Sequence, residues 1–555
     1  MWISKLLPFI FALLSAALLS WGCRADMSDD PGVAEDAAPY LRLTLHFEDG
    51  ADTRSNPTGG EDGDGREHAQ VRESRITSLH LLFYNSGSDD AINGDGNEDI
   101  KYSLYLRDEQ LTEIFNKEND KRDGYYLIPL KGYRPEENDR VLVFANGRPG
   151  EFNDATKISV LRDKKPSATW SGNKVNESSN FSMATARSGN EVNAMVDGKI
   201  YFELNGNKVA GTKEDPFYIS ATIERTAARI DFWYPQGNKK ADNEFVYTVG
   251  EKIANVHITH IRPVNAMTQP SWYFKRVTTS LTDKTLLYCK PETPVNGMPG
   301  NFVVEPNTKK KPGGSIAADA TDLSGWFGDS QAQNVKADFF SESYSVANLI
   351  TNGETLPMDA NGNLVTSGDW ESLILAYTNE NTMFGKDFAN ATDYLTGLAF
   401  KAVYHPVMVY NGYDSTNSTD PLTQDNKYQY GQTFWRVSPT DQTLSEAASK
   451  YFSNEEAANA YKAANPQLNG IITKYDGGVC YYNMWIRHAN YDNPAPDPQD
   501  FFEMEYAIVR NNIYRIGVTF SGPGNPEPSI AEPHHIQSRI FVRKWNLRVH
   551  SPIIM

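Results

Sequence analysis

Short runs of apolar residues, separated by polar and glycine-containing turns, predict a mainly β protein. In the clearest run, 40–47, Leu41, Leu43, Leu45 and Phe47 alternate strictly with polar residues after Tyr40. Successive side chains of a strand point to opposite faces, so this run is predicted to be a half-buried strand. Further strands are predicted at 76–84, 102–106, 124–129, 140–146, 199–204, 217–223, 229–234, 247–249, 252–260, 400–410, 478–485, 504–510, 514–521 and 540–549.

Helical spacing is confined to a few short segments. The run 108–115 begins with a capping aspartate and predicts one short helix. Ser453 and Glu456 have the spacing of a capping box, and the alanine-rich run after them predicts a helix that ends before Asn465-Pro466. A second short helix is expected at 445–452. We interpret this pair as an insertion on a β scaffold.

The strand pattern and the length predict about two antiparallel β-sandwich domains. At about 100 to 200 residues per domain, a chain of 555 residues corresponds to two to four domains. The polar segment 236–240 is placed at the boundary, which gives an N-terminal sandwich at 55–237 and a C-terminal sandwich at 238–555. The helical insertion falls in the second sandwich.

The N-terminus has the pattern of an export signal. Residues 1–22 contain Lys5 followed by an apolar run, and a membrane-spanning anchor is the weaker alternative, since the run contains Pro8 and ends at an acidic flank. Ser20-Trp21-Gly22-Cys23 resembles a bacterial lipobox, so Cys23 is the predicted lipid attachment site. The acidic residues after Cys23 resemble the tether of surface lipoproteins in some Gram-negative bacteria. Residues 23–54 are then a lipidated propeptide.

Charge and cysteine content narrow the possible partners. The net charge of -18 would repel a phosphate backbone, so nucleic acid is not an expected partner. Cys289 and Cys480 are the two thiols that remain after Cys23. They are expected to be buried apolar residues, although the compartment would also permit a disulfide.

The sequence contains no motif that indicates catalysis, a metal or a cofactor. His-Glu-x-x-His, Cys-x-x-Cys, Gly-x-Ser-x-Gly and phosphate-binding glycine loops are all absent. His257 and His260 would point to opposite faces of a strand, and the loop that begins at Asp89 lacks acidic residues at two ligand positions of a calcium loop. The protein is therefore not expected to be an enzyme, and no cofactor is predicted.

Three segments carry a resemblance to a known family. Residues 481–488 (YYNMWIRH), 504–514 (MEYAIVRNNIY) and 224–230 (ERTAARI) resemble the fimbrillin family, the polymerising subunits of type V pili, and within it the main subunit of the short, or minor, fimbrium. The resemblance implies transthyretin-like sandwiches in a cell-surface fimbrium that supports adhesion. It also implies an outer-membrane lipoprotein precursor, cleavage by an arginine-specific protease, and strand exchange with further copies and with accessory fimbrial subunits.

The family pattern places processing near the first strand. On that pattern the cut falls between Arg54 and Ser55, in a polar segment, 48–75, that is expected to be exposed and flexible. Arg66, Arg72 and Arg75 are the alternative sites. Cleavage would remove the plug strand formed by Leu41, Leu43, Leu45 and Phe47.

The C-terminus offers a replacement strand. Trp545, Leu547 and Val549 alternate with polar residues, and Ile553 extends the apolar supply, so these residues are the predicted donor strand. The equal alternative is that 545–549 is simply the last strand of its own domain. A surface glycan-binding lipoprotein that uses its 29 Tyr and 10 Trp is the alternative function, and a glycoside hydrolase is a third.

Overall fold

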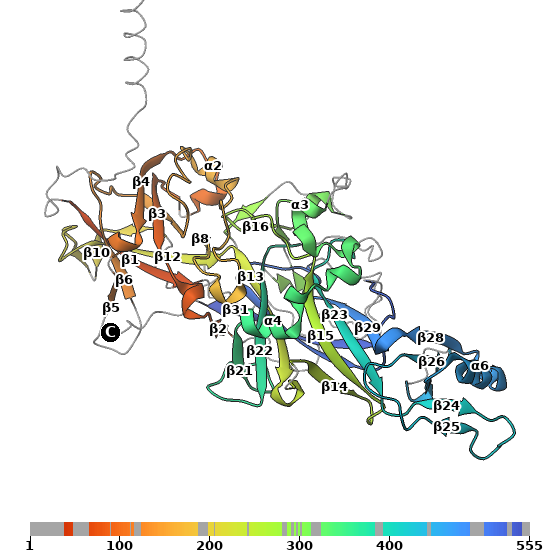
Figure 1. Ribbon diagram of the computed structural model, residues 1–555. Coiled ribbons are helices and arrows are strands. Elements are labelled where there is room, and N and C mark those ends of the chain that lie inside the picture. Colours follow the sequence, from red (N-terminus) through yellow and green to blue (C-terminus); the bar gives the residue numbers. More distant parts are fainter. Residues whose placement is uncertain are drawn as a thin grey trace, which may run out of the picture. The chain divides into compact units, whose positions relative to one another are not determined.

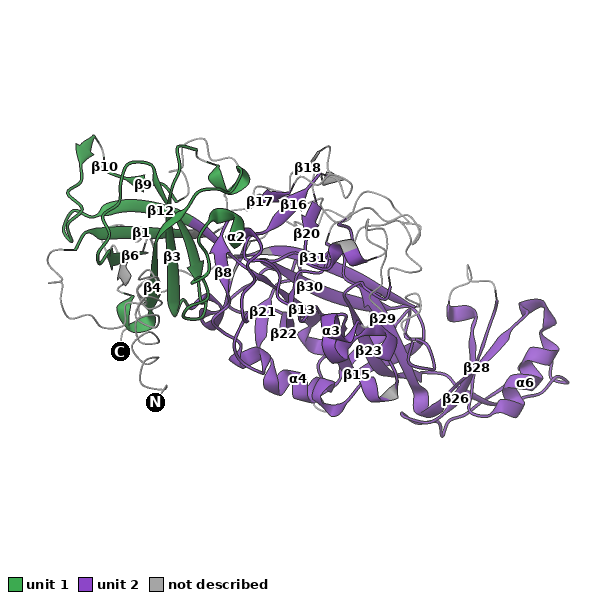
Figure 2. Ribbon diagram, turned by 90° about the horizontal axis from the view of Figure 1, so that it is seen from above, with its two compact units in different colours: residues 1–45, 76–161, 195–221 green, residues 46–75, 162–194, 222–555 purple. Residues whose placement is uncertain are grey.

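The protein is mainly β and divides into two compact units. The computed structural model describes residues 38–47, 66–88, 90–111, 113–115, 124–186, 198–204, 206–240, 243–279, 286–289, 294–295, 298–299, 302–311, 323–382, 392–440, 446–488, 504–529 and 535–546 (Figure 1). Unit 1 comprises 1–45, 76–161 and 195–221, and unit 2 comprises 46–75, 162–194 and 222–555 (Figure 2). The units divide at 221/222 instead of the expected 237/238. Two segments of the N-terminal half belong to unit 2 because their partners lie there.

Unit 1 is built on antiparallel strands. Its strands are β1 (Tyr40–Phe47), β3 (Ser78–Asn85), β4 (Ile100–Arg107), β5 (Glu113–Phe115), β6 (Gly124–Pro129), β7 (Asp139–Ala145), β9 (Ile200–Tyr201), β10 (Glu203–Leu204), β11 (Asn207–Lys208) and the start of β12 (Phe217–Arg225). β3 pairs with β4 and β7, and β6 pairs with β1 and β5. The helix α2 (Ile158–Arg162) follows β7 in the sequence. β3 and β7 are almost wholly buried, which gives this unit its own core.

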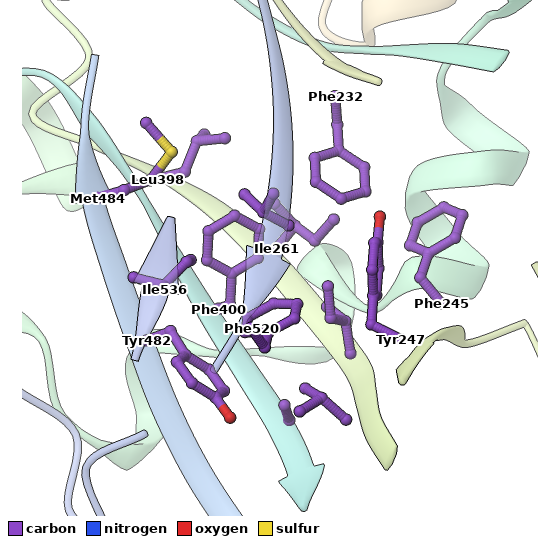
Figure 3. Close-up of a cluster of buried hydrophobic side chains, with 14 of the residues drawn as sticks. Phe232, Phe245, Tyr247, Ile261, Leu398, Phe400, Tyr482, Met484, Phe520 and Ile536 are labelled. Carbon is purple, nitrogen blue, oxygen red and sulfur yellow. The ribbon is translucent and has the colours of Figure 1, made fainter. Parts of the chain in front are cut away.

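Unit 2 is a sandwich of two sheets. The first sheet has the order β2 (Arg66–His68), β31 (Ile536–Asn546), β30 (Asn512–Phe520), β13 (Ala227–Pro235), β22 (Trp370–Asn379), β21 (Thr355–Met358). The second has the order β14 (Phe245–Val249), β15 (Ala254–Val264), β23 (Gly397–Pro406), β29 (Val479–Trp485). Apolar side chains of both sheets, among them Phe232, Phe400 and Tyr482, fill the space between them (Figure 3). Val346 of α4 (Val346–Asn352) joins this core.

The first sheet of unit 2 is mixed instead of purely antiparallel. β13 pairs parallel with β30, and β2 pairs parallel with β31. Parallel neighbours need a long connection, and here the paired strands are hundreds of residues apart in the sequence. Such pairings leave no local signal in the sequence, which explains why an all-antiparallel arrangement was expected.

The expected helical insertion is a small α/β module. The strands β24 (Tyr410–Tyr413), β25 (Leu422–Gln424), β26 (Phe434–Ser438), β27 (Lys450–Phe452) and β28 (Ile471–Tyr475) form one sheet, and α6 (Glu455–Ala464) packs on it. α6 confirms the predicted alanine-rich helix. Its cap is Asn454, whose side chain accepts from the Ala457 amide, and not Ser453. The second predicted helix, 445–452, is wrong in the described residues, where a 3₁₀ turn leads into β27.

Two other expectations are corrected. Residues 108–110 form a 3₁₀ turn, but Glu113–Phe115 is strand β5, because its backbone pairs with β6. The predicted strand 504–510 is a turn and an irregular segment, in which Glu505 and Arg510 are engaged in ion pairs.

The remaining elements of unit 2 are short. They are β8 (Met183–Thr185), which pairs with β12, the small sheets of β16 (Arg276–Thr278), β17 (Leu287–Tyr288) and β20 (Phe302–Val304) and of β18 (Pro294–Val295) and β19 (Met298–Pro299), and helix α3 (Ser324–Phe327). Among the residues described, no helix has the length and apolar character needed to cross a membrane.

Candidate assembly site

The predicted plug strand is an interior strand of unit 1. β1 has β6 on one side, with Leu41 opposite Ile128 and Leu43 opposite Tyr126, and β12 on the other. Leu41 and Leu43 are fully buried, and Leu45 is half-buried. Because β1 has a neighbour on each side, its removal would open a slot between β6 and β12.

The outer face of β1 is also in contact with both neighbours. The guanidinium of Arg42 lies 4.0 Å from the ring centre of Tyr125 on β6 and 5.4 Å from that of Tyr218 on β12. Cation–π contacts of this kind contribute about 0.5 to 1 kcal/mol at exposed sites. Backbone pairing, buried leucines and Arg42 together hold β1 in place.

The C-terminal strand of unit 2 ends at a buried tryptophan. Trp545 of β31 has 0% exposure, and its ring stacks on that of Tyr377 at 5.7 Å and 8°. Its indole nitrogen donates to Glu73 Oε2 at 3.2 Å, and its carbonyl accepts from Arg225 Nη1 at 2.5 Å. Trp545 is thus a core residue of its own unit. This is the placement that the alternative interpretation of 545–549 expects of its first residue.

Trp545 lies beside a cluster of buried charges. Arg229 contacts Glu67 at 2.7 Å, Glu73 at 3.0 Å and Asp231 at 2.9 Å. Arg515 Nη2 contacts Glu67 Oε2 at 2.7 Å and Asp231 Oδ2 at 3.1 Å. Each of these side chains is at most 3% exposed. Breaking such a buried pair by removing one partner costs about 3 to 5 kcal/mol, because the other charge is left uncompensated.

Opposite charges in the cluster shift the pKa values of Glu67 and Arg229 toward their ionised forms. Burial alone would raise the pKa of Glu67, but Arg515 and Arg229 hold it below its usual value. Burial alone would lower the pKa of Arg229, but Asp231, Glu73 and Glu67 hold it well above its usual value. Burial lowers the pKa of Arg225 to about 9, against the attraction of Glu73, so Arg225 remains charged at pH 7.

The segment that supplies Glu67 and Glu73 was expected to be an exposed loop. Residues 66–75 are instead part of the described structure, with β2 and a 3₁₀ turn at Val71–Ser74. Arg72, one alternative cleavage site, is half-buried and donates to the Ser178 carbonyl and to the Tyr377 hydroxyl, both at 2.8 Å. Its other terminal nitrogen pairs with Glu354 at 2.7 Å. The composition of this segment is that of a loop. The prediction failed because the charged residues of the segment pair with residues that are far away in the sequence.

The remaining predicted site residues fall in other parts of the chain. Outside the described residues lie Cys23, Arg54, Ser55, Leu547, Val549, Ile553 and the side chain of Phe47. The cluster residues Glu67, Glu73, Arg225, Arg229 and Arg515 were not identified from the sequence. A usable signal was present, since Arg229, Asp231 and Arg515 interrupt otherwise apolar strands, where a charge needs an opposite charge.

A second buried charge cluster lies elsewhere in unit 2. Arg510 makes a bidentate pair with Glu380 at 2.8 and 2.7 Å, and Lys275 pairs with Glu224 at 3.1 Å. Glu224 and Arg225 are adjacent on β12 and therefore point to opposite faces, so each serves a different cluster. This second cluster has no contribution from residues 66–74 in the contacts described.

Metal and thiol chemistry find little support in the described residues. No group of three or more potential metal ligands occurs among them, and His257 Nδ1 lies 3.0 Å from Glu244 Oε2. Cys289 and Cys480 are buried and form no disulfide with each other, which agrees with the prediction of buried apolar cysteines. All eight tryptophans outside 1–37 are buried or half-buried, so none presents a fully exposed stacking surface.

A family model matches the C-terminal part of the chain. Residues 473–550 match "Major fimbrial subunit protein type IV, Fimbrillin, C-terminal". This region contains β29, β30, β31 and Trp545. The match supports the resemblance to the fimbrillin family over these residues. No curated protein matches the chain.

Several solved structures align with most of this chain at low sequence identity. A proposed cell adhesion protein from Bacteroides eggerthii is 9% identical, with 92% of this chain and 97% of that chain covered and a TM-score of 0.35. A fimbrilin from Porphyromonas gingivalis is 14% identical, with 93% and 99% covered and a TM-score of 0.30. The tip fimbrial protein Mfa3 of Porphyromonas gingivalis, with a C-terminal truncation, is 9% identical, with 91% and 100% covered and a TM-score of 0.28. At these identities and TM-scores, the likeness transfers no site.

Proposed function

We propose that this protein is a structural subunit of a cell-surface fimbria that supports adhesion. It is exported as an outer-membrane lipoprotein through Cys23, cleaved between Arg54 and Ser55 by an arginine-specific protease, and polymerised by strand exchange. Its partners are further copies of itself and accessory fimbrial subunits. Within the fimbrillin family, we place it with the main subunit of the short fimbrium. The match of residues 473–550 to the fimbrillin C-terminal model supports the family assignment.

The observation that carries the proposal is the position of β1. It is the first described strand, it lies between β6 and β12, and it buries Leu41 and Leu43 completely. Removing the strand exposes the apolar partners of its side chains to water, at a cost of about 1.5 to 3 kcal/mol for each large side chain. The emptied slot also leaves backbone hydrogen-bond donors and acceptors unpaired on two strands. A strand from another copy would remove both costs. Because slot and donor are different segments of the chain, the contact between two copies would be heterologous and could build an open filament.

The donor residues are those that follow the anchored end of β31. Trp545 is held inside unit 2, so the exchanging residues in this proposal are Leu547, Val549 and Ile553, and Trp545 fixes the point from which they extend. Alternating apolar side chains give register, and backbone pairing gives affinity.

Limited proteolysis of the precursor tests the proposal. Residues 24–555 are treated with a limiting amount of an arginine-specific protease, the new N-terminus is sequenced, and the product is run unheated on a denaturing gel. The proposal expects a start at Ser55 together with a ladder of multimers. A monomer that stays stable after the same cut would contradict it and would direct the search to glycan arrays.

A further inference from the structure

Residues 66–74, which we call the clasp, join the N-terminal part of the chain to its C-terminal strand. In β2, Arg66 lies opposite Lys544, Glu67 opposite Trp545 and His68 opposite Asn546, in parallel register. Beyond β2, the 3₁₀ turn places the Glu73 carboxylate where it accepts a hydrogen bond from the indole nitrogen of Trp545. The clasp therefore contacts the last residues of β31 through both backbone and side chains.

The clasp supplies most of the negative charge in the buried cluster. Three arginines, Arg225, Arg229 and Arg515, are fully or nearly fully buried there. Their compensating carboxylates are Asp231 and the two clasp residues, Glu67 and Glu73. Three positive charges thus meet three negative ones. Without the clasp, one carboxylate would remain for three buried arginines.

One of these arginines, Arg225, ties the clasp directly to β31. Arg225 Nε donates to the Glu73 carbonyl at 3.1 Å, and Arg225 Nη1 donates to the Trp545 carbonyl. The Arg225 guanidinium also lies 4.4 Å from the centre of the Trp545 ring. Loss of Glu73 would therefore weaken the contacts that fix Trp545 as well as those of the clasp itself.

We propose that the clasp is retained in the processed subunit, confines processing to arginines upstream of Arg66, and holds β31 in its sheet. Cleavage is hydrolysis of one peptide bond, in which water adds a hydroxyl to the carbonyl carbon and a proton to the leaving amine. A cut after Arg72 or Arg75 would place Glu67 on the removed side, and a cut after Arg66 would put a new ammonium on Glu67. Each of these cuts would leave the positive and negative charges of the buried cluster unequal in number. This inference deepens the proposed function and rests on its processing step.

The geometry opposes cleavage within the clasp. A protease needs an extended, accessible segment, whereas the clasp is paired with β31 and Arg72 is held by Ser178, Tyr377 and Glu354. Cutting there requires local opening, and the rate then follows the population of the open form.

The test compares the full precursor, residues 24–555, with two variants. One carries Glu67→Gln and Glu73→Gln, which keep shape and remove charge, and the control carries Glu380→Gln, which alters the second buried cluster. Each is digested with an arginine-specific protease, and cuts after every arginine are timed by mass spectrometry. Among Arg54, Arg66, Arg72 and Arg75, we expect wild type and control to be cut only after Arg54. The double variant should be cut after Arg72 or Arg75 at least about tenfold faster than wild type.

Equally fast cutting of wild type upstream of and within the clasp would overturn the proposal, as would identical patterns for wild type and the double variant. Should the double variant not fold, native-state hydrogen exchange on the wild type replaces it. The amides of 66–74 and of the C-terminal end of β31 are expected to open together. Fast exchange in the clasp beside a protected strand end would overturn the proposal.

Multimer formation is scored separately, so its absence would count against strand exchange and not against the clasp.

Discussion

At the scale of single residues, the buried charges of unit 2 restrict which strands can lie side by side more than its apolar core does. Glu67, Arg229 and Arg515 are costly to bury, and an opposite charge within about 3 Å of each offsets that cost. They connect β2, β13 and β30, three strands from distant parts of the sequence. The cluster thereby specifies which strands meet, beyond what the shape of apolar side chains can specify.

The cluster also predicts a pH dependence for Glu67. Because its pKa is lowered in the folded state, the ionised carboxylate contributes stability above its unfolded pKa of about 4.3, and this contribution is lost as the pH falls through the folded pKa. Glu67→Gln should therefore destabilise the protein by about 3 to 5 kcal/mol at pH 7 and by less below pH 4. Urea unfolding midpoints measured between pH 7 and pH 3 check this.

A matched control for that titration is Glu109→Gln, since Glu109 is exposed. It should leave the midpoint nearly unchanged at every pH. A constant difference between Glu67→Gln and wild type across the range would contradict the assignment of the acid dependence to this carboxylate.

At the scale of elements, patterns that a segment satisfies by itself were predictable. The alternation of 40–47 predicted β1, and the alanine-rich run after Ser453 predicted α6. The failures are segments whose partners are distant. Glu113–Phe115 has helical spacing, but its backbone pairs with β6. The clasp has a polar composition, but its two glutamates are buried in ion pairs with arginines of β13 and β30. Of the candidate site, the sequence could predict that 40–47 is a strand but not its interior position, which depends on β6 and β12.

The cap of α6 yields a prediction at this scale. Asn454 accepts a hydrogen bond from the Ala457 amide at 2.8 Å, which satisfies a donor that the helix leaves free. Asn454→Ala should destabilise the helix by about 1 kcal/mol, and Ser453→Ala, its neighbour, by less. Hydrogen exchange of the first-turn amides of α6 measures both. Equal effects would indicate that Ser453 shares the capping role.

At the scale of the whole molecule, the limits of the two units could not be read from composition. The polar segment 236–240 has the appearance of a linker, yet β13, which precedes it, is a central strand of unit 2. The segments 46–75 and 162–194 also belong to that unit. A linker-like composition therefore marks a turn between two strands of unit 2.

Assembly gives the prediction that belongs to this scale. Deleting residues 550–555, which removes Ile553, should leave the fold intact, because β31 and Trp545 are retained. The cleaved deletion variant should form fewer multimers than the cleaved full chain on an unheated gel. Circular dichroism of both precursors serves as the folding control. An undiminished ladder would show that the donor lies elsewhere.

The contact between Glu73 and Trp545 also has a consequence for how the chain acquires its structure. The two residues are 472 positions apart. Closing so long a loop has an entropic cost, and the contact between Glu73 and Trp545 can offset this cost only when both residues have been synthesised. Contacts between residues so far apart in the sequence also slow folding. While the chain emerges from its N-terminus, Arg225 and Arg229 are made long before Arg515 and Trp545. The first sheet of unit 2 can therefore be completed only when the C-terminal strand has been synthesised.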